Sequence, residues 1–181
     1  MDGDAPDLSL SRTITIEPDL IIRNALPGDR SILVGFREAL QDSEREYHPN
    51  RPPGVEIGDA HLAYLEELAL ERDGRIYVAG SAGDILGFLV CFIERLDAGD
   101  LHVYDREREY GYISDLYVSP RSRGRGIGTA LMEAAESHFR GRGLSVIRVN
   151  TLADNRAAIE FYRAIDYGFY EITLEKRLEE K

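Results

Sequence analysis

The chain has 181 residues, 43% of them hydrophobic and 30% charged, a balance that fits one soluble domain with its own core. Its formal net charge of −11 disfavours nucleic acid and anionic membrane surfaces as partners, because both would repel it. No apolar run is long enough to cross a bilayer, and the start MDGDAPDLSLSR lacks the basic region and apolar core of a signal peptide.

The single cysteine, Cys91, lies within the apolar run GFLVCFI and cannot form an internal disulfide. We interpret it as a small buried hydrophobic residue in a protein of a reducing compartment, and we expect a cytoplasmic location. The four histidines show no metal-ligand spacing with this cysteine, so we expect no metal cofactor.

Residues 1–18 are polar and contain two prolines, so we expect a flexible N-terminal segment followed by a single domain over residues 19–181. Residues 20–25 predict a short strand. Asp29 can cap a helix that runs to about Glu46. The residues expected on the inward side of this helix are Ile32, Leu33, Phe36 and Leu40.

A proline-rich break over residues 48–54 ends that helix, and a second helix is expected over residues 59–71. Its inward residues are expected to be Leu62, Leu65, Leu68 and Ala69. Two strands follow, over residues 75–81 and 85–96, with a hairpin turn at 82–84.

The acidic stretch over residues 97–109 indicates a loop or a strand extension, and residues 109–118 predict a central strand. Alternation along this strand predicts Ile113, Asp115 and Tyr117 on one face. A glycine-rich turn then leads into a helix that ends at about Arg140. Its expected inward residues are Ile127, Leu131, Ala134 and Ala135.

The last part predicts a strand over residues 144–152, a helix capped by Asp154 or Asn155, and a final strand over residues 169–178. The order is therefore β-α-α-β-β-β-α-β-α-β. Hairpins in the first half and helical crossovers in the second indicate an α/β (α+β) fold. We expect a mixed, mostly antiparallel sheet of about six strands, flanked by about four helices.

The most informative segment is LYVSPRSRGRGIGTALM, residues 116–132. It joins a strand to a helix through a turn that carries three glycines and three arginines. Glycine lets a ligand approach the backbone, while the first turn of a helix offers unpaired N–H groups and partial positive charge. The segment therefore predicts a site for a phosphate or pyrophosphate.

Three other phosphate-binding designs do not fit. A P-loop needs a lysine, and the chain has none between Arg95 and Lys176. A dinucleotide fingerprint needs the spacing G-x-G-x-x-G near the first strand, whereas this turn reads G-x-G-x-G two-thirds of the way along the chain. The partner motifs of a protein kinase, H-R-D and D-F-G, do not occur.

The run Arg123-Gly124-Arg125-Gly126-Ile127-Gly128 resembles the acyl-CoA pyrophosphate loop, Arg/Gln-x-x-Gly-x-Gly/Ala, of the Gcn5-related N-acetyltransferase (GNAT) family. The later run NRAAIEFY, residues 155–162, with Gly168-Phe169 resembles a second segment of that family. The ending Ile165-Asp166-Tyr167 before Gly168 is one or two residues longer than the usual form. The resemblance covers roughly residues 21 to 178.

The resemblance implies the fold given above and an N-acetyltransferase that uses acetyl-CoA as acyl donor. It also implies that the strand before the turn and the next strand splay apart, and that the acyl-CoA arm enters between them. The residues that it implies for binding the cofactor are Leu116, Tyr117, Val118, Arg123, Gly124, Arg125, Gly126, Ile127, Gly128, Thr129 and Asn155.

Acetyl transfer to an amine needs a route for the amine's proton, an acid for the departing thiolate and a donor for the oxyanion. Tyr162 resembles the family tyrosine that points at the CoA sulfur, so it is the candidate acid. Asp115 is the candidate base, because a carboxylate on an apolar strand is costly without a function or a partner; a salt-bridged structural role is the equal alternative. Glu94, Glu109 and water are alternatives. The N–H of Leu116 or Val118, if freed by a bulge, is the candidate oxyanion donor.

The acceptor is expected to be a primary amine that attacks the thioester directly in a ternary complex. Carboxylates on two segments predict an acidic mouth that favours a small cationic amine. They are Glu38, Asp42, Glu44 and Glu46 on one segment and Asp97, Asp100, Asp105, Glu107 and Glu109 on the other. A protein N-terminus or lysine is the alternative acceptor. A non-catalytic acyl-CoA-binding module is the alternative function of another class. The family resemblance also implies a homodimer.

Overall fold

The computed structural model describes residues 19–81 and 83–178, so the predicted flexible segment over residues 1–18 lies outside the described residues. The chain divides into two compact units, Met1–Asn150 and Thr151–Lys181, which are described separately below. That residues 19–181 form a single domain stays a prediction.

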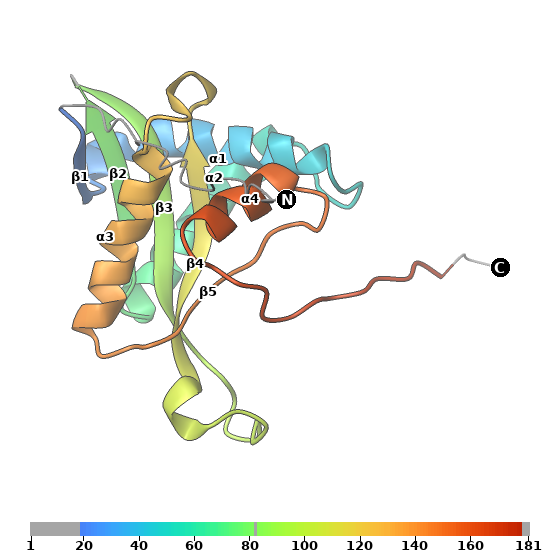
Figure 1. Cartoon of the computed structure of the whole chain (residues 1–181). Coiled ribbons are helices and arrows are strands. Elements are labelled where there is room, and N and C mark those ends of the chain that lie inside the picture. The colour runs from blue at the N-terminus through green and yellow to red at the C-terminus, as the bar shows by residue number, and fades with distance from the viewer. Residues whose placement is uncertain (1–18, 82, 179–181) are drawn as a thin grey trace, which may run out of the picture. The chain divides into compact units, whose positions relative to one another are not determined.

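The first unit contains a mixed sheet whose strand order follows the sequence (Figure 1). Its strands are β1 (Ile21–Asn24), β2 (Arg75–Ser81), β3 (Asp84–Arg95), β4 (Glu109–Val118) and β5 (Ile147–Val149). The first four pair antiparallel, and β5 pairs parallel with β4. The predicted fold class is therefore confirmed.

Helices cover both faces of this sheet (Figure 1). On one face lie α1 (Arg30–Arg45) and α2 (Gly54–Glu71), whose leucines form a buried cluster with Val78, Phe88, Val90 and Phe92 of the sheet. On the other face lies α3 (Ile127–Gly141), which packs so closely on β4 that a Cβ at Gly111 would overlap the ring of Phe139.

The inward residues predicted for α2 are all buried, but the helix begins five residues earlier than expected, at Gly54. The N–H of Gly54 donates to the Asp42 carboxylate at 2.8 Å, so a side chain of α1 caps this helix. Glycine is required at this position, because a Cβ there would overlap the carbonyl oxygen of Glu38.

The predicted inward face of α1 is partly wrong. The buried residues are Leu33, Arg37 and Gln41, while Ile32 is 42% exposed. Asp29 stands at the N-cap position, but its carboxylate binds the Arg23 guanidinium at 2.6 Å and the Leu26 N–H at 2.7 Å and does not cap the helix. In both cases, on the buried face of α1 and at Asp29, contacts with residues outside the helix explain where the polar side chains lie.

The predicted faces of β4 are corrected by a β-bulge. Asp115 pairs with Val90 and Ile113 pairs with Cys91, so Ser114 is an extra residue on β4. Because one extra residue reverses the alternation, Asp115 and Tyr117 share the α1–α2 face with Tyr112, while Ile113 lies on the α3 face.

The sheet contains five strands within the described residues, and the final strand predicted over residues 169–178 is absent there. A strand needs a hydrogen-bonded neighbour, and this segment has a strand-like pattern but takes part in no ladder. The strand predicted over residues 144–152 is reduced to three residues for the same reason.

The second unit contains the helix α4 (Arg156–Ala164). Asn155 is its N-cap, and the side-chain oxygen of Asn155 accepts a hydrogen bond from the Ala158 N–H at 3.1 Å. This confirms the predicted cap and decides between Asp154 and Asn155.

Candidate acyl-CoA and acetyl-transfer site

Within the first unit as described, the carboxyl-terminal half of β4 has no neighbouring strand on the side of β5; we call residues 114–118 its free edge. The parallel ladder to β5 covers only Gly111, Tyr112 and Ile113, and β4 continues for five residues beyond it. The bulge at Ser114 falls where the two strands part, as expected of a device that bends and twists a strand.

The amides of Leu116 and Val118 point toward this free edge. The Ser119 N–H donates to the Leu86 carbonyl at 2.8 Å, so the amide of Ser119 points toward β3. Because the direction alternates along a strand, the N–H groups of Val118 and Leu116 point the other way. The Val118 carbonyl confirms this direction, because it accepts from the Arg123 Nε at 3.0 Å.

The turn after β4 holds two glycines in the left-handed region. Gly124 has a φ of 75° and Gly126 a φ of 76°, values that side chains with a Cβ disfavour. The three arginines predicted to line the turn, Arg121, Arg123 and Arg125, are all exposed. A sequence of right- and left-handed residues directs successive N–H groups into one concave surface, which is a frequent anion site.

The helix α3 begins directly after this turn, with Gly126 as its N-cap. Its first helical bond runs from the Ala130 N–H to the Gly126 carbonyl at 3.0 Å. The N–H groups of Ile127, Gly128 and Thr129 therefore precede the helical ladder and can serve a bound anion. Ile127 buries its side chain, so it can contribute only its backbone.

Two residues of the predicted cofactor set have other partners. The Tyr117 side chain is 8% exposed and lies in the core, where its ring centroid is 5.1 Å from that of Phe36. The side-chain oxygen of Asn155 is engaged as the cap of α4. Asn155 and Tyr162 both belong to the second unit, and Tyr162 lies on α4 with its ring 5.9 Å from that of Tyr167.

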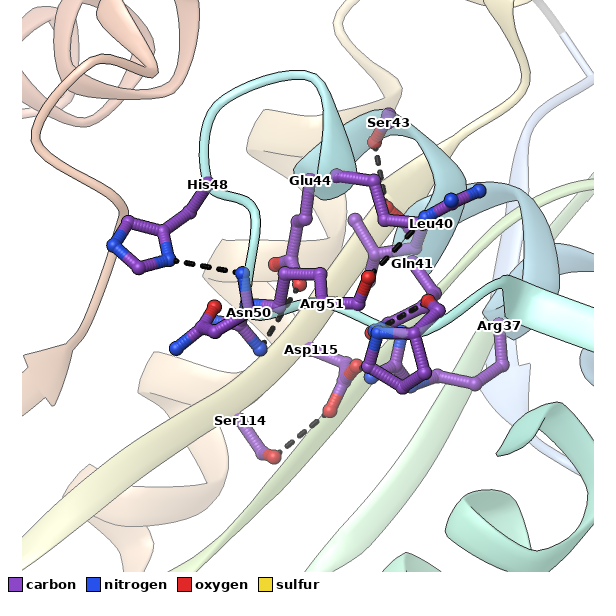
Figure 2. A network of polar contacts seen from close by, with 12 residues as sticks. Arg37, Leu40, Gln41, Ser43, Glu44, His48, Asn50, Arg51, Ser114 and Asp115 are labelled. Atoms are coloured by element: carbon purple, nitrogen blue, oxygen red, sulfur yellow. Dashed lines mark hydrogen bonds and ion pairs between the residues drawn. The ribbon is translucent and has the colours of Figure 1, made fainter. Parts of the chain in front are cut away.

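Asp115 is buried beside the bulge, with an Arg37 guanidinium against it (Figure 2). The Asp115 Oδ1 lies 3.2 Å from the Arg37 Nε, and the Asp115 Oδ2 accepts a hydrogen bond from the Ser114 Oγ at 2.8 Å. Both oxygens of this carboxylate therefore already have a protein partner.

The alternative bases are also paired. Glu94 binds Arg72, and the Glu109 Oε1 accepts from the Arg95 Nη2 at 2.8 Å. The loop between β3 and β4 lies at the end of the sheet opposite the glycine-rich turn (Figure 1). From Glu109 to Val118 the strand spans about 30 Å, at about 3.3 Å per residue. Arg37 of α1 contacts Asp115, six residues or about 20 Å along β4 from Glu109, so the two acidic segments predicted to form one mouth lie apart.

Sequence reasoning missed Arg37 and Gln41. The available signal was their spacing, because Leu33, Arg37 and Gln41 recur at every fourth position and so share one face of α1. Asp115, Ser114, Arg37 and Gln41 are thus brought together from β4 and α1, behind the free edge.

Two further titratable groups face this cluster. Burial raises the pKa of Glu44, whose side chain is 25% exposed, against the opposing effects of Arg51 and Arg37. Burial lowers the pKa of His61, and Arg37 lowers it further. Both shifts favour the neutral forms, and Glu44 lies 3.5 Å from Arg51.

The raised pKa of Glu44 predicts a pH-dependent effect of Glu44→Gln on stability. Between the ordinary value near 4.5 and the raised value, the folded protein binds more protons than the unfolded chain, so stability falls as pH rises. Glutamine removes this penalty. We expect the free energy of unfolding of the variant, relative to wild type, to increase from about pH 4 to about pH 7 in urea titrations.

The matched control is Glu46→Gln, which removes one negative charge at an exposed position two residues further on. A Glu44→Gln variant whose relative stability stays constant or declines over this pH range would contradict the assignment of burial as the dominant cause.

Two surface cavities lie elsewhere. One of about 530 Å³ lies among β1, α1, α2 and β2, and one of about 390 Å³ is lined by Arg95, Asp105 and Arg108. Neither contains a residue of the glycine-rich turn. In the described part of the chain, no three His, Cys, Asp or Glu side chains gather as a metal site would require, and no helix is long and apolar enough to span a membrane.

Comparison with known proteins agrees with this geometry. The sequence model of the acetyltransferase (GNAT) family matches residues 36–169, so the chain belongs to that family. A relative from Methanocaldococcus jannaschii, described as an uncharacterized N-acetyltransferase, is 29% identical over 60% of this chain and 46% of its own length. The chain thus spans about half the length of that curated relative.

Solved structures share the fold. A protein from Clostridium acetobutylicum described as a predicted acetyltransferase, solved with acetyl-CoA, is 19% identical and superposes with a TM-score of 0.67 over 87% of this chain and 96% of that chain. An aminoglycoside N-acetyltransferase in complex with CoA is 21% identical, with a TM-score of 0.64 over 88% of this chain and 94% of that chain.

Proposed function

We propose that this protein is an acetyl-CoA-dependent N-acetyltransferase that moves an acetyl group to a primary amine by direct attack in a ternary complex. One observation supports this most. The free edge of β4 is followed, after a short 3-10 helix (Pro120–Ser122), by the left-handed glycine turn and the N-terminus of α3. An acyl-pantetheine arm can hydrogen-bond along such an edge while the diphosphate binds the amides of the turn.

The proposed cofactor contacts come mainly from the backbone. The N–H groups of residues 124–129 bind the diphosphate, and the arginines Arg123 and Arg125 add positive charge around it. The outward N–H of Leu116 or Val118 serves as the oxyanion donor, since neither has a strand partner on that side among the described residues. Asn155 is proposed as a further cofactor contact on the sequence resemblance alone.

For the chemical steps we propose Tyr162 as the acid that protonates the departing thiolate, an assignment that rests on the sequence resemblance. Asp115 is proposed to take part beside the free edge. A carboxylate offers about four lone-pair sites. The contacts with Arg37 and Ser114 therefore leave Asp115 able to bind the amine itself, or a water molecule that removes the proton of the amine. Water remains the alternative base.

The acceptor is proposed to be a small cationic amine. Support comes from the net charge of −11 and from the exposed carboxylates of Asp42 and Glu46 near the end of α1. A protein N-terminus or lysine is the alternative acceptor. A cytoplasmic location and a homodimer remain predictions that follow from the sequence.

The decisive experiment combines calorimetry with CoA and an amine screen that follows free thiol release from acetyl-CoA. We expect CoA binding and amine-dependent thiol release. If the protein binds CoA but no amine in the screen causes thiol release, the non-catalytic binding module is the better assignment. If CoA gives no heat while another phosphorylated compound does, the cofactor assignment fails.

The protein itself should not disturb a thiol assay. Cys91 is fully buried, and burial raises the pKa of its thiol to about 12. We expect no reaction of the folded protein with a disulfide reagent at pH 8 over the time of the assay, and one equivalent after denaturation. Reaction of the native protein at the rate of a free thiol would contradict the buried placement.

A further inference from the structure

A buried chain of polar contacts connects the segment between α1 and α2 to the bulge on β4 (Figure 2). It begins at the Pro52 carbonyl, which accepts from the Gln41 Nε2 at 3.1 Å. The Gln41 Oε1 accepts from the Arg37 Nη2 at 3.1 Å, and the Arg37 Nε lies 3.2 Å from the Asp115 Oδ1. Ser114, the bulged residue, completes the chain through its hydrogen bond to Asp115.

Stability alone is a weak explanation for this chain. The side chains of Arg37 and Asp115 are only 5% and 6% exposed, and a buried ion pair often contributes no more than well-packed hydrophobic residues of similar size. The Arg37–Asp115 pair is also not bidentate, because only the Nε–Oδ1 contact joins the two groups. The Arg37 Nε and Nη1 are both buried and make no hydrogen bond to the described residues, so the 3.2 Å contact to Asp115 is an ion pair without hydrogen-bond geometry.

This chain of contacts can instead hold the backbone of β4 in position next to the Leu116 amide. Ser114 and Asp115 immediately precede Leu116, whose N–H points to the free edge of β4. Among the described residues the edge gains no support from β5 beyond Ile113, so pairing with β3 on the other side and contacts from the α1–α2 face together hold the direction of this amide. Arg37 and Gln41 supply such contacts, and they reach the Pro52 carbonyl just before α2.

We propose that Arg37 and Gln41 are positioning residues for acetyl transfer, which hold Asp115 and the Leu116 amide in place and connect them to the segment before α2. This inference rests on the proposed function. A donor aimed at the developing oxyanion loses effect when its direction changes slightly, so loosening the bulge lowers kcat more than it lowers CoA affinity.

The main variant is Gln41→Leu, which breaks both hydrogen bonds of Gln41 but leaves the Arg37–Asp115 ion pair and much of the side-chain volume. Arg37→Lys is the second, because a lysine keeps the charge but cannot contact Asp115 and Gln41 with one planar group. We expect kcat to fall about tenfold or more in each, with the Kd for CoA within about twofold of wild type.

The matched control is Arg30→Lys. Arg30 forms an ion pair with Asp59 that also joins α1 to α2, but the two side chains are 39% and 71% exposed and lie outside the buried chain. We expect wild-type kcat from this variant. A variant that only weakened the fold would lose stability in urea yet keep its kcat at temperatures where it stays folded.

A second readout does not require turnover. Hydrogen exchange of the amides of Asp115 and Tyr117, which point toward β3, should be faster in Gln41→Leu than in wild type and unchanged in Arg30→Lys. Wild-type exchange at these amides in Gln41→Leu would overturn the inference, whatever happens to activity. If the wild-type enzyme is active, the inference is also overturned when Gln41→Leu shows faster exchange at these amides but keeps the wild-type kcat.

The two possible failures are distinguishable. If the wild type releases no thiol with any amine, the proposed function fails, and the catalytic part of this inference fails with it. The exchange measurement still decides whether Arg37 and Gln41 hold the bulge. Should Arg37→Lys not fold, Gln41→Leu alone decides the result.

Discussion

Replacing Gly124 with valine should weaken CoA binding at least about tenfold, which corresponds to roughly 1.4 kcal/mol. Gly124 has a φ of 75°, where a side chain with a Cβ costs roughly 1–2 kcal/mol and a β-branched one is a clear outlier. We expect the turn to relax toward negative φ, which rotates the amides of residues 124–129 away from the diphosphate. Isothermal titration with CoA measures the change.

The chain provides a matched control at the other end of α3. Gly143 has a φ of 78°, and at both glycines a Cβ would meet no atom within 4 Å. Gly143→Val therefore carries a comparable backbone cost away from the turn. It should lower the free energy of unfolding by a similar amount while leaving the Kd for CoA unchanged. Equal loss of affinity in both variants would mean that the effect is one of general stability, and would contradict the assignment of the turn.

Tyr162→Phe should lower kcat by roughly 100-fold or more, the usual contribution of a general acid, while the Kd for CoA stays within about twofold of wild type. The change removes one hydroxyl group and keeps the ring, so packing within the second unit should be preserved. Steady-state kinetics with the best acceptor from the amine screen, together with calorimetry, separates the two quantities.

Tyr167→Phe is the control, because Tyr167 lies beside Tyr162 with ring centroids 5.9 Å apart and has no proposed part in the chemistry. We expect nearly wild-type kcat from it. If Tyr162→Phe also keeps wild-type kcat over the accessible pH range, the departing thiolate receives its proton from another source, and Tyr162 is a structural residue.

Local sequence patterns predicted most of the elements in the first unit. The strand over residues 109–118 has the predicted bounds, and the glycine-rich turn leads into α3 as expected. These features depend on short-range properties, namely alternation of apolar residues and the backbone freedom of glycine. Asn155 as the cap of α4 is of the same kind, because a cap acts within three residues of itself.

The errors arose where an outcome depended on a distant segment. Nothing within residues 109–118 reveals the bulge at Ser114, because it is defined by which residues of β3 face β4. The segment over residues 169–178 alternates like a strand but has no ladder, because pairing is a property of two segments. The acidic segments lie at opposite ends of the sheet for the same kind of reason (Figure 1).

The sequence by itself determined the glycine-rich turn between β4 and α3 and the family, because strand alternation, helical periodicity and the backbone freedom of glycine are properties of short segments. Only the tertiary structure decided what surrounds Asp115. Arg37 comes from a helix 78 residues earlier in the chain, and the behaviour of a buried carboxylate depends on the charges and donors that folding places against it.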